Sequence, residues 1–288
     1  MILMSLLLVL SIERLVAKTS RWHGEFYVRA YRDWLEQKGL LSESTKELAL
    51  WFYMLAPALL VAAVEVWLLG SALTFVLQTL VLFIAIGCPA LRATYKCFLN
   101  AADRGDLQAC SMYTDELGHC ENQGDENSAR GQGRSFGQHL TWLNYQHYAA
   151  VMLWFVAFGA PGVIFYVVSR STADSLCAAK HPLATSARHL MYALDFIPVR
   201  ITALGLLFMG HFSRALPEWV KHVLSPETSA YDVLTSVSAK AEMLSEQELE
   251  AQTYNASVEP KVLVKLAKRN VMFLLAATSI LTLSGFIA

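Results

Sequence analysis

The chain has 288 residues, of which 55% are hydrophobic and 16% are charged. Its mean hydropathy of +0.38 exceeds that of most soluble domains of this length, so the composition predicts an integral membrane protein. The formal net charge is −1 at pH 7, and no basic stripe interleaved with aromatic residues occurs, which excludes a nucleic-acid partner.

Three apolar runs in the first third of the chain predict membrane-spanning helices. Residues 1–17 lack the basic region and the small-residue cleavage site of a signal peptide, so we expect them to remain as the first helix. Residues 48–69 and 71–87 follow, with a bend at Gly70, and both are long enough to cross the hydrocarbon core. These two runs predict a helical hairpin.

The segment between the first two spans predicts an amphipathic helix. Apolar residues occur at every fourth position, namely Trp22, Phe26, Ala30 and Trp34, and charged residues occupy the other faces of the helix. Such a helix could lie at the membrane interface with its aromatic stripe toward lipid, or it could pack that stripe on the rest of the protein. The sequence leaves both alternatives open.

The middle of the chain contains a long stretch without Asp, Glu, Lys or Arg. Its most apolar part, about 148–168, predicts another span. Gly159-Ala160-Pro161-Gly162 lies inside this span and should kink it, because proline removes a backbone donor and clashes with the preceding turn.

Residues 190–210 form an apolar run that Asp195, Pro198 and Arg200 interrupt. This run could cross the membrane, re-enter it or lie buried against the other helices. Its two charged residues are the best candidates for function, since ionisable groups at membrane depth are costly. They could border a site for a polar ligand or an ion, or form a structural ion pair that fixes helix packing.

The last span is residues 270–287, which follow a cluster of Lys and Arg. Pro260 should separate this span from a polar stretch with helical periodicity. Basic residues concentrate in segments 18–47, 88–134 and 211–269, which are therefore predicted to be cytoplasmic and helical. Six crossings with the amino terminus outside would satisfy this distribution.

These elements predict an all-α fold, a polytopic integral membrane helical bundle with cytoplasmic helical segments, in which residues 1–288 form a single membrane domain. Residues 116–135 are rich in Gly, Asn and Gln, and we expect a mobile loop there. An odd number of cysteines, 5, favours reduced thiols over a disulfide framework.

Two further motifs offer weaker signals for a site. Arg104-Gly105-Asp106 places a cation and a carboxylate at a glycine break, where they could hold a phosphate or a metal, although a solvated turn is the commoner outcome. His119 and Cys120, with Cys110 upstream, lack both the spacing and the fourth ligand of a zinc site. The sequence therefore leaves the metal and the cofactor unknown.

The order of several motifs resembles the AmpE family of bacterial inner-membrane proteins. The most specific is Leu194-Asp195-Phe196-Ile197-Pro198-Val199-Arg200, and Gly210-His211, Ala215–Trp219 and Asn100–Asp106 also fit. The resemblance covers nearly the whole chain. It implies a multi-pass protein of the inner membrane that takes part in sensing or signalling linked to β-lactamase induction, antibiotic resistance and peptidoglycan recycling.

AmpE is in turn similar to CobD/CbiB, a membrane enzyme of cobalamin synthesis that forms an amide. Gly105-Asp106, Gly159–Gly162 with Tyr166, Asp174-Ser175 and Pro198–Arg200 resemble motifs of that enzyme. Its acidic Glu-Asn-x-x-Asp motif should fall where this chain has Trp142–His147, and both carboxylates are absent there. This departure argues against the synthase reaction, and we name no catalytic residue.

The combined interpretation is a regulatory protein with a polar pocket for a small polar or anionic ligand. The residues expected to border it are Arg104, Asp106, Asp174, Asp195 and Arg200. A muropeptide-like or nucleotide-like molecule would suit it, and a homo-oligomer in the lipid bilayer is a further expectation. The alternatives are a CobD/CbiB-like synthase and a small-molecule transporter with broken helices, against which stands the lack of a visible internal repeat.

Overall fold

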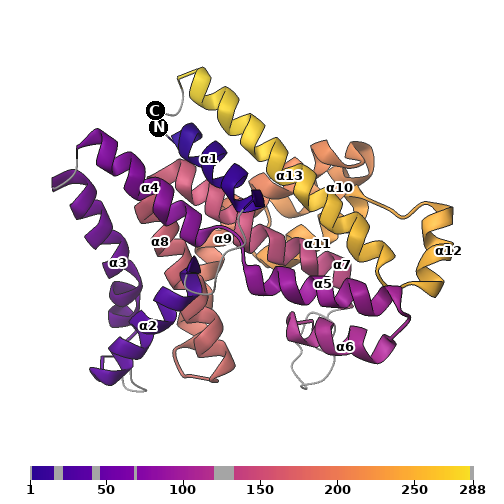
Figure 1. The fold of residues 1–288 in the computed structure, drawn as a ribbon, viewed down its shortest axis with the longest axis horizontal. Coiled ribbons are helices and arrows are strands. Elements are labelled where there is room, and N and C mark those ends of the chain that lie inside the picture. The colour runs from indigo at the N-terminus through magenta and orange to yellow at the C-terminus, as the bar shows by residue number, and fades with distance from the viewer. Residues whose placement is uncertain (1, 16–21, 41–45, 68–69, 120–132, 286–288) are drawn as a thin grey trace. The chain divides into compact units, whose positions relative to one another are not determined.

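The computed structural model describes residues 2–15, 22–40, 46–67, 70–119 and 133–285 (Figure 1). Throughout these ranges the regular structure is helical, and no strand occurs in them. This confirms the predicted all-α fold. The chain divides into two compact units, and residues 116–135 of the predicted loop lie largely outside the described residues.

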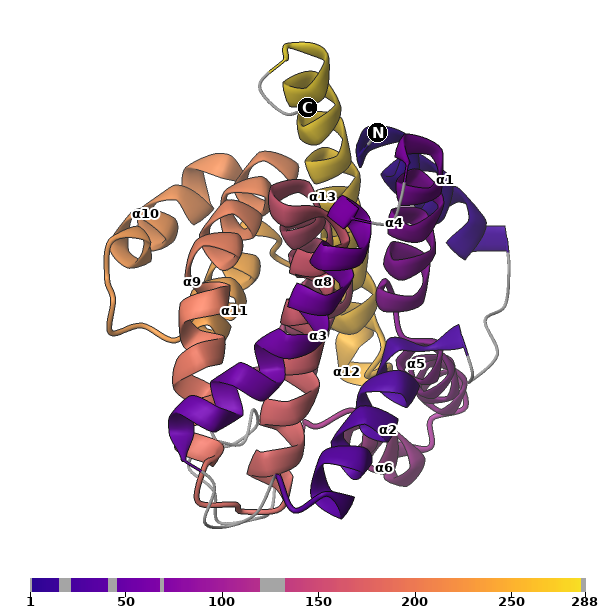
Figure 2. The same cartoon turned by 90° about the vertical axis from the view of Figure 1, so that its left-hand side faces the viewer.

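Unit 1 comprises Met1–Gly87, His147–Pro198 and Leu275–Ala288. Its helices are α1 (Ile2–Leu15), α2 (Gly24–Gln37), α3 (Glu47–Trp67), α4 (Ser71–Ala85), α8 (Ala150–Ala178), the first part of α9 (Ala184–Met209) and the end of α13 (Val258–Leu283). Helix α8 is central, because α1, α2, α3 and α4 all pack against it. Figure 2 shows α3 lying across α8.

Unit 2 comprises Cys88–Gln146 and Val199–Leu274. It contains α5 (Pro89–Asp103), α6 (Leu107–Glu116), α7 (Phe136–Asn144), α10 (Phe212–Val223), α11 (Ala230–Ala241), α12 (Glu246–Tyr254), the remainder of α9 and most of α13. A π-helical turn, η2 (Tyr145–Ala149), follows α7. Helix α11 packs against α7 and α10 and is buried along most of its length.

Five helical stretches among the described residues are long and apolar enough to cross a membrane: Glu47–Trp67, Ser71–Asp103, Phe136–Ala178, Ala184–Met209 and Val258–Leu283. They overlap the spans expected from residue 48 onward. The run at 190–210 is part of an unbroken helix, α9, with Pro198 inside it. Helix α1 is apolar but has only 14 residues, so its crossing stays a prediction, as do the membrane topology and the single domain.

Two local predictions about proline and glycine have opposite outcomes. The kink in the central span is confirmed, because Gly159 adopts φ 64° and ψ −151° inside α8. The prediction that Pro260 ends the polar stretch before the last helix is wrong. Helix α13 begins at Val258 and includes Pro260 in its first turn, where a missing N–H is tolerated because those donors have no partner within the helix.

The segment predicted to be amphipathic is α2. It combines features of both alternatives, packing on the protein and an exposed aromatic stripe. Val28 and Leu35 are buried, and the helix packs on α8 and α4. Trp22, Phe26 and Trp34 are about half exposed. The helix therefore packs through one face and leaves an aromatic stripe available to a membrane interface.

Candidate functional site

A stripe of polar side chains runs along α8. Tyr166, Arg170 and Asp174 are spaced by four residues, so they lie on one face of the helix. Tyr166 is fully buried and Arg170 is 4% exposed, whereas Asp174 is exposed. The guanidinium carbon of Arg170 lies 5.9 Å from the centroid of the Tyr166 ring, within range of a cation–π interaction.

Helix α9 adds a carboxylate to this stripe. Asp195 is 3% exposed, and its Oδ1 accepts a hydrogen bond of 3.1 Å from the Tyr166 hydroxyl. Arg170, Asp174 and Asp195 all act electrostatically on Tyr166. A carboxylate that loses water on burial needs such donors and opposite charges to remain ionised.

Histidine and glutamate side chains complete the cluster. His147, from η2, is 6% exposed, and among the described residues its Nδ1 has no hydrogen-bond partner. A carboxylate oxygen of Glu25 and a ring nitrogen of His147 lie within 4.8 Å of each other. Arg170 and His23 both act electrostatically on His147, and His23 caps the start of α2 by accepting a hydrogen bond from the Glu25 amide. We call these seven residues the α8 polar cluster: His23, Glu25, His147, Tyr166, Arg170, Asp174 and Asp195.

The backbone of His147 is held by Gly87. The Gly87 amide donates a 2.9 Å hydrogen bond to the His147 carbonyl. Gly87 has φ +71°, and a Cβ there would lie 2.6 Å from Glu13 Oε1 and 2.9 Å from the Tyr148 hydroxyl. Tyr148 in turn donates a 2.8 Å hydrogen bond to Glu13, which is 6% exposed. Only glycine allows the chain to pass this close to a buried carboxylate.

Arg200 makes hydrogen bonds within unit 2, at the end of α10. Its Nε donates to the Val223 carbonyl at 2.7 Å and its Nη2 to the Ser225 carbonyl at 2.8 Å. The Val223 oxygen belongs to the group of carbonyls that a helix end leaves without partners, and the Ser225 oxygen lies just beyond that end. A cation there also complements the helix dipole. The side chain is 8% exposed. The geometry favours a structural role for Arg200 over ligand binding.

The turn between α5 and α6 holds Arg104 and Asp106. Gly105 has φ +73°, and Asp106 caps α6 by accepting a 2.9 Å hydrogen bond from the Ala109 amide. Both charged residues are exposed. Helix capping explains Asp106, and this geometry matches the solvated turn that the sequence left as the commoner outcome.

Of the five predicted site residues, the structure therefore gathers Asp174 and Asp195 around Tyr166 in unit 1. It places Arg104 and Asp106 together at one turn of unit 2, and it engages Arg200 with α10. Arg170 was not among the predicted site residues, because the expected span ended at about residue 168. The spacing of Tyr166, Arg170 and Asp174 was the signal that could have found it.

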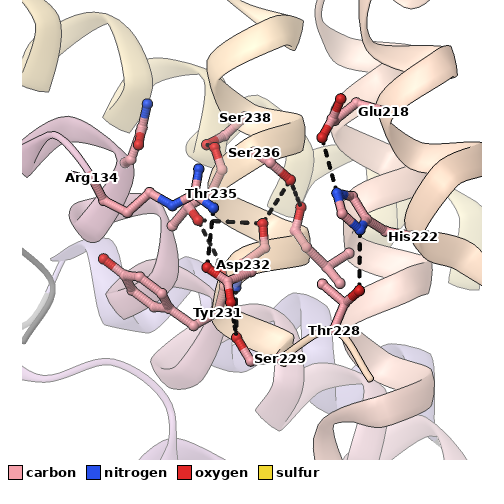
Figure 3. A network of polar contacts seen from close by, with 12 residues as sticks. Arg134, Glu218, His222, Thr228, Ser229, Tyr231, Asp232, Thr235, Ser236 and Ser238 are labelled. Carbon is pink, nitrogen blue, oxygen red and sulfur yellow. Dashed lines mark hydrogen bonds and ion pairs between the residues drawn. The ribbon is translucent and has the colours of Figure 1, made fainter. Parts of the chain in front are cut away.

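A second polar network lies in unit 2, around α11 (Figure 3). Arg134 pairs with Asp232 at 3.0 Å. Asp232 accepts a 2.7 Å hydrogen bond from the Ser229 hydroxyl, and the Asp232 amide donates back to that hydroxyl oxygen at 3.0 Å. This reciprocal pair caps the start of α11, so the network fixes the helix within its unit.

The neighbouring histidines are also engaged in hydrogen bonds. His119 Nε2 lies 2.9 Å from the Arg134 carbonyl, and His139 Nε2 lies 2.9 Å from the Leu117 carbonyl. Cys120 of the weak zinc motif lies outside the described residues. The hydrogen bond of His119 gives that ring a structural explanation without a metal.

The fold and the cluster together define a class: an all-α, multi-pass membrane protein with ionisable residues buried in its helical core. The family model described as "Regulatory signalling modulator protein AmpE" matches residues 1–288. The chain therefore belongs to the AmpE family.

Two relatives support this assignment and extend it. Protein AmpE of Shigella flexneri is 25% identical over 292 residues, which cover 99% of each chain. Cobalamin biosynthesis protein CobD of Chromobacterium violaceum is 25% identical over 173 residues, which cover 58% of this chain and 53% of that protein. No solved structure matches the chain significantly.

Proposed function

We propose that this regulatory membrane protein binds a small polar ligand with an anionic group at the α8 polar cluster. We further propose that ligand binding couples the bacterial inner membrane to β-lactamase induction and cell-wall recycling. The observation that carries the proposal is the buried His147 Nδ1, which has no hydrogen-bond partner among the described residues and on whose ring the buried Arg170 acts electrostatically. An unsatisfied buried group of this kind is costly, and a ligand would satisfy it.

The charges of the cluster suit a ligand of mixed polarity. Arg170 and the histidines can bind a carboxylate or a phosphate, whereas Glu25, Asp174 and Asp195 can accept hydrogen bonds from amine or hydroxyl groups. A muropeptide-like or nucleotide-like molecule carries both kinds of group. In this proposal Asp174 and Asp195 contact the ligand, whereas Asp106 and Arg200 act through helix capping.

The substitution Arg170→Gln tests the proposal. It removes the charge and keeps a side chain that can hydrogen-bond, so we expect β-lactamase induction to be lost while the protein still inserts and accumulates in the membrane. Lys180→Gln is the matched control, because Lys180 is exposed just beyond the end of α8. Wild-type induction by Arg170→Gln at wild-type protein levels would refute the proposed site.

An amide-forming synthase is the second candidate. The similarity to CobD favours it, and Tyr166 and Asp174, which resemble motifs of that enzyme, lie in the cluster. The missing Glu-Asn-x-x-Asp carboxylates argue against it. Nucleotide-dependent amide ligation by the purified protein, lost in Arg170→Gln, would favour the synthase over the regulator.

A further inference from the structure

Unit 1 contains an apolar cavity that the α8 polar cluster does not occupy. Its volume is about 580 Å³, and α2, α3, α4 and α8 all contribute to its wall. Apart from tyrosine and tryptophan side chains on α2, the lining side chains are aliphatic, among them Ala56, Leu60 and Val167. A cavity of this size is in the range that binds small molecules, and its apolar wall disfavours water.

Helix α2 closes one side of the cavity through contacts at its start and near its middle. At the start of α2, a Cβ at Gly24 would lie 3.5 Å from the Ile84 carbonyl oxygen and from Val167, so the backbone is in close contact with α4 and α8. Farther along, the Tyr31 hydroxyl donates a 2.9 Å hydrogen bond to the Tyr53 carbonyl on α3. Burial, with a contribution from Tyr53, raises the pKa of Tyr31, so this donor stays neutral. The contacts that hold α2 against α3, α4 and α8 thus also form the wall of the cavity.

The cavity leads to a charged residue. A narrow second hollow shares Tyr31 and Val168 with the cavity and is also lined by Arg32 and Thr172. The Arg32 side chain is 19% exposed and lies 3.7 Å from Asp33 and 3.5 Å from Glu36. It also hydrogen-bonds the Ser175 hydroxyl. The apolar cavity therefore lies next to the positively charged Arg32, and the half-exposed carboxylates of Asp33 and Glu36 flank this arginine.

The surroundings of the cavity are those of a membrane interface. Helices α3, α4 and α8 lie in stretches that can cross the bilayer, and Leu60 on the cavity wall is 65% exposed. Tyr27 and Trp34 also line the cavity and are 52% and 49% exposed. Amphipathic aromatic rings concentrate where the hydrocarbon core meets the headgroups. In that position, acyl chains are the apolar groups available to fill the cavity.

We propose that this cavity binds one phosphatidylethanolamine molecule, with an acyl chain between α2, α3, α4 and α8 and the headgroup at Arg32. The headgroup assignment follows from the charges: Arg32 matches the phosphate, and Asp33 and Glu36 match the ammonium group. A purely anionic lipid would face those two carboxylates without compensation. The bound lipid fixes α2 against the membrane helices.

Native mass spectrometry of the full chain tests the lipid site. We expect the protein, released from phosphatidylethanolamine-containing nanodiscs, to retain one such lipid, and we expect Ala56→Phe to lower the retained fraction by about tenfold or more. Ala63→Phe is the matched control, because Ala63 is exposed on the same helix and is not part of the cavity wall. Equal retention by the two variants, or no retained lipid in the wild type, would overturn the proposal.

Photocrosslinking provides a second readout, in which the labelling of the wild-type protein is compared with that of Arg32→Gln. Phosphatidylethanolamine with a diazirine in its acyl chain should label the cavity walls on α2, α3, α4 and α8 above the other lipid-facing helices. Arg32→Gln should keep that labelling but remove the preference for phosphatidylethanolamine over phosphatidylglycerol. Labelling spread evenly over all apolar faces, or an unchanged headgroup preference in Arg32→Gln, would contradict the assigned site.

Discussion

Two buried arginines, one in each unit, show how similar side chains acquire different roles. Arg200 is 8% exposed and donates to backbone carbonyls at the end of α10. Arg170 is 4% exposed and lies over the Tyr166 ring, among ionisable side chains. The first arrangement completes a helix end. The second acts electrostatically on His147, whose Nδ1 has no partner among the described residues. Burial of a charge therefore identifies a candidate site only together with its partners.

Of the substitutions considered, removal of the Arg200 side chain should have the largest effect on the free energy of unfolding. Arg200→Ala leaves the carbonyls of Val223 and Ser225 without their donors, so we expect a loss of about 2–4 kcal/mol in the free energy of unfolding. Thermal or denaturant unfolding in detergent measures it. Arg214→Ala, at an exposed position, should change the stability by less than about 0.5 kcal/mol. A stable Arg200→Ala protein with lost induction would instead assign Arg200 to the ligand site.

The glycine that holds His147 provides the next comparison. Gly87→Ala should cost about 1–3 kcal/mol for the positive φ, with more for the contact of the new methyl group with Glu13 and Tyr148. Gly39→Ala is the matched control, because Gly39 has φ +68° and no atom of the described residues lies within 4 Å of an added Cβ. Equal losses of unfolding free energy in the two variants would show that the contact with Glu13 contributes nothing.

Within the α8 polar cluster, Tyr166→Phe removes the hydrogen bond to Asp195 and keeps the ring under Arg170. We expect a loss of about 1–2 kcal/mol in unfolding free energy, since the buried carboxylate loses a donor. Tyr254→Phe is the control at a position that is 89% exposed. An unchanged free energy of unfolding in Tyr166→Phe would mean that other groups stabilise Asp195.

The smallest effect concerns pH and Glu218 in unit 2. Burial alone would raise the pKa of Glu218, but the hydrogen bond with His222 and the charge of Lys221 outweigh it and lower that pKa below the ordinary 4.5. Figure 3 shows the His222 contact, which is 2.9 Å long. This stabilisation should be present above pH 4.5 and disappear as the pH falls through the lowered pKa.

Glu218→Gln should therefore flatten the loss of stability on the acid side of pH 4.5, as followed by unfolding at a series of pH values. Glu227→Gln, at an exposed position, serves as the control. The interpretation fails if Glu218→Gln leaves the acid limb of the wild-type stability profile unchanged.

Hydropathy and helical periodicity were sufficient to predict the long apolar helices and the kink at Gly159, because each depends on residues near one another in the sequence. The partners of buried charges depend on tertiary packing. Asp195 and Arg200 suggested a pair by their proximity in the sequence, and this pair stays a prediction. Tertiary packing adds Tyr166 as a partner of Asp195 and the end of α10 as a partner of Arg200. Arg170 lay beyond the expected span, because hydropathy alone ended that span at residue 168 whereas α8 continues to Ala178.

An experimental density map of the protein in nanodiscs, with a muropeptide added, tests the central claim most directly. The account predicts non-protein density within hydrogen-bonding distance of His147 Nδ1 and Arg170, and its absence in Arg170→Gln. A map in which the α8 polar cluster is closed on itself, with every polar atom bonded to protein or to water, would contradict the claim.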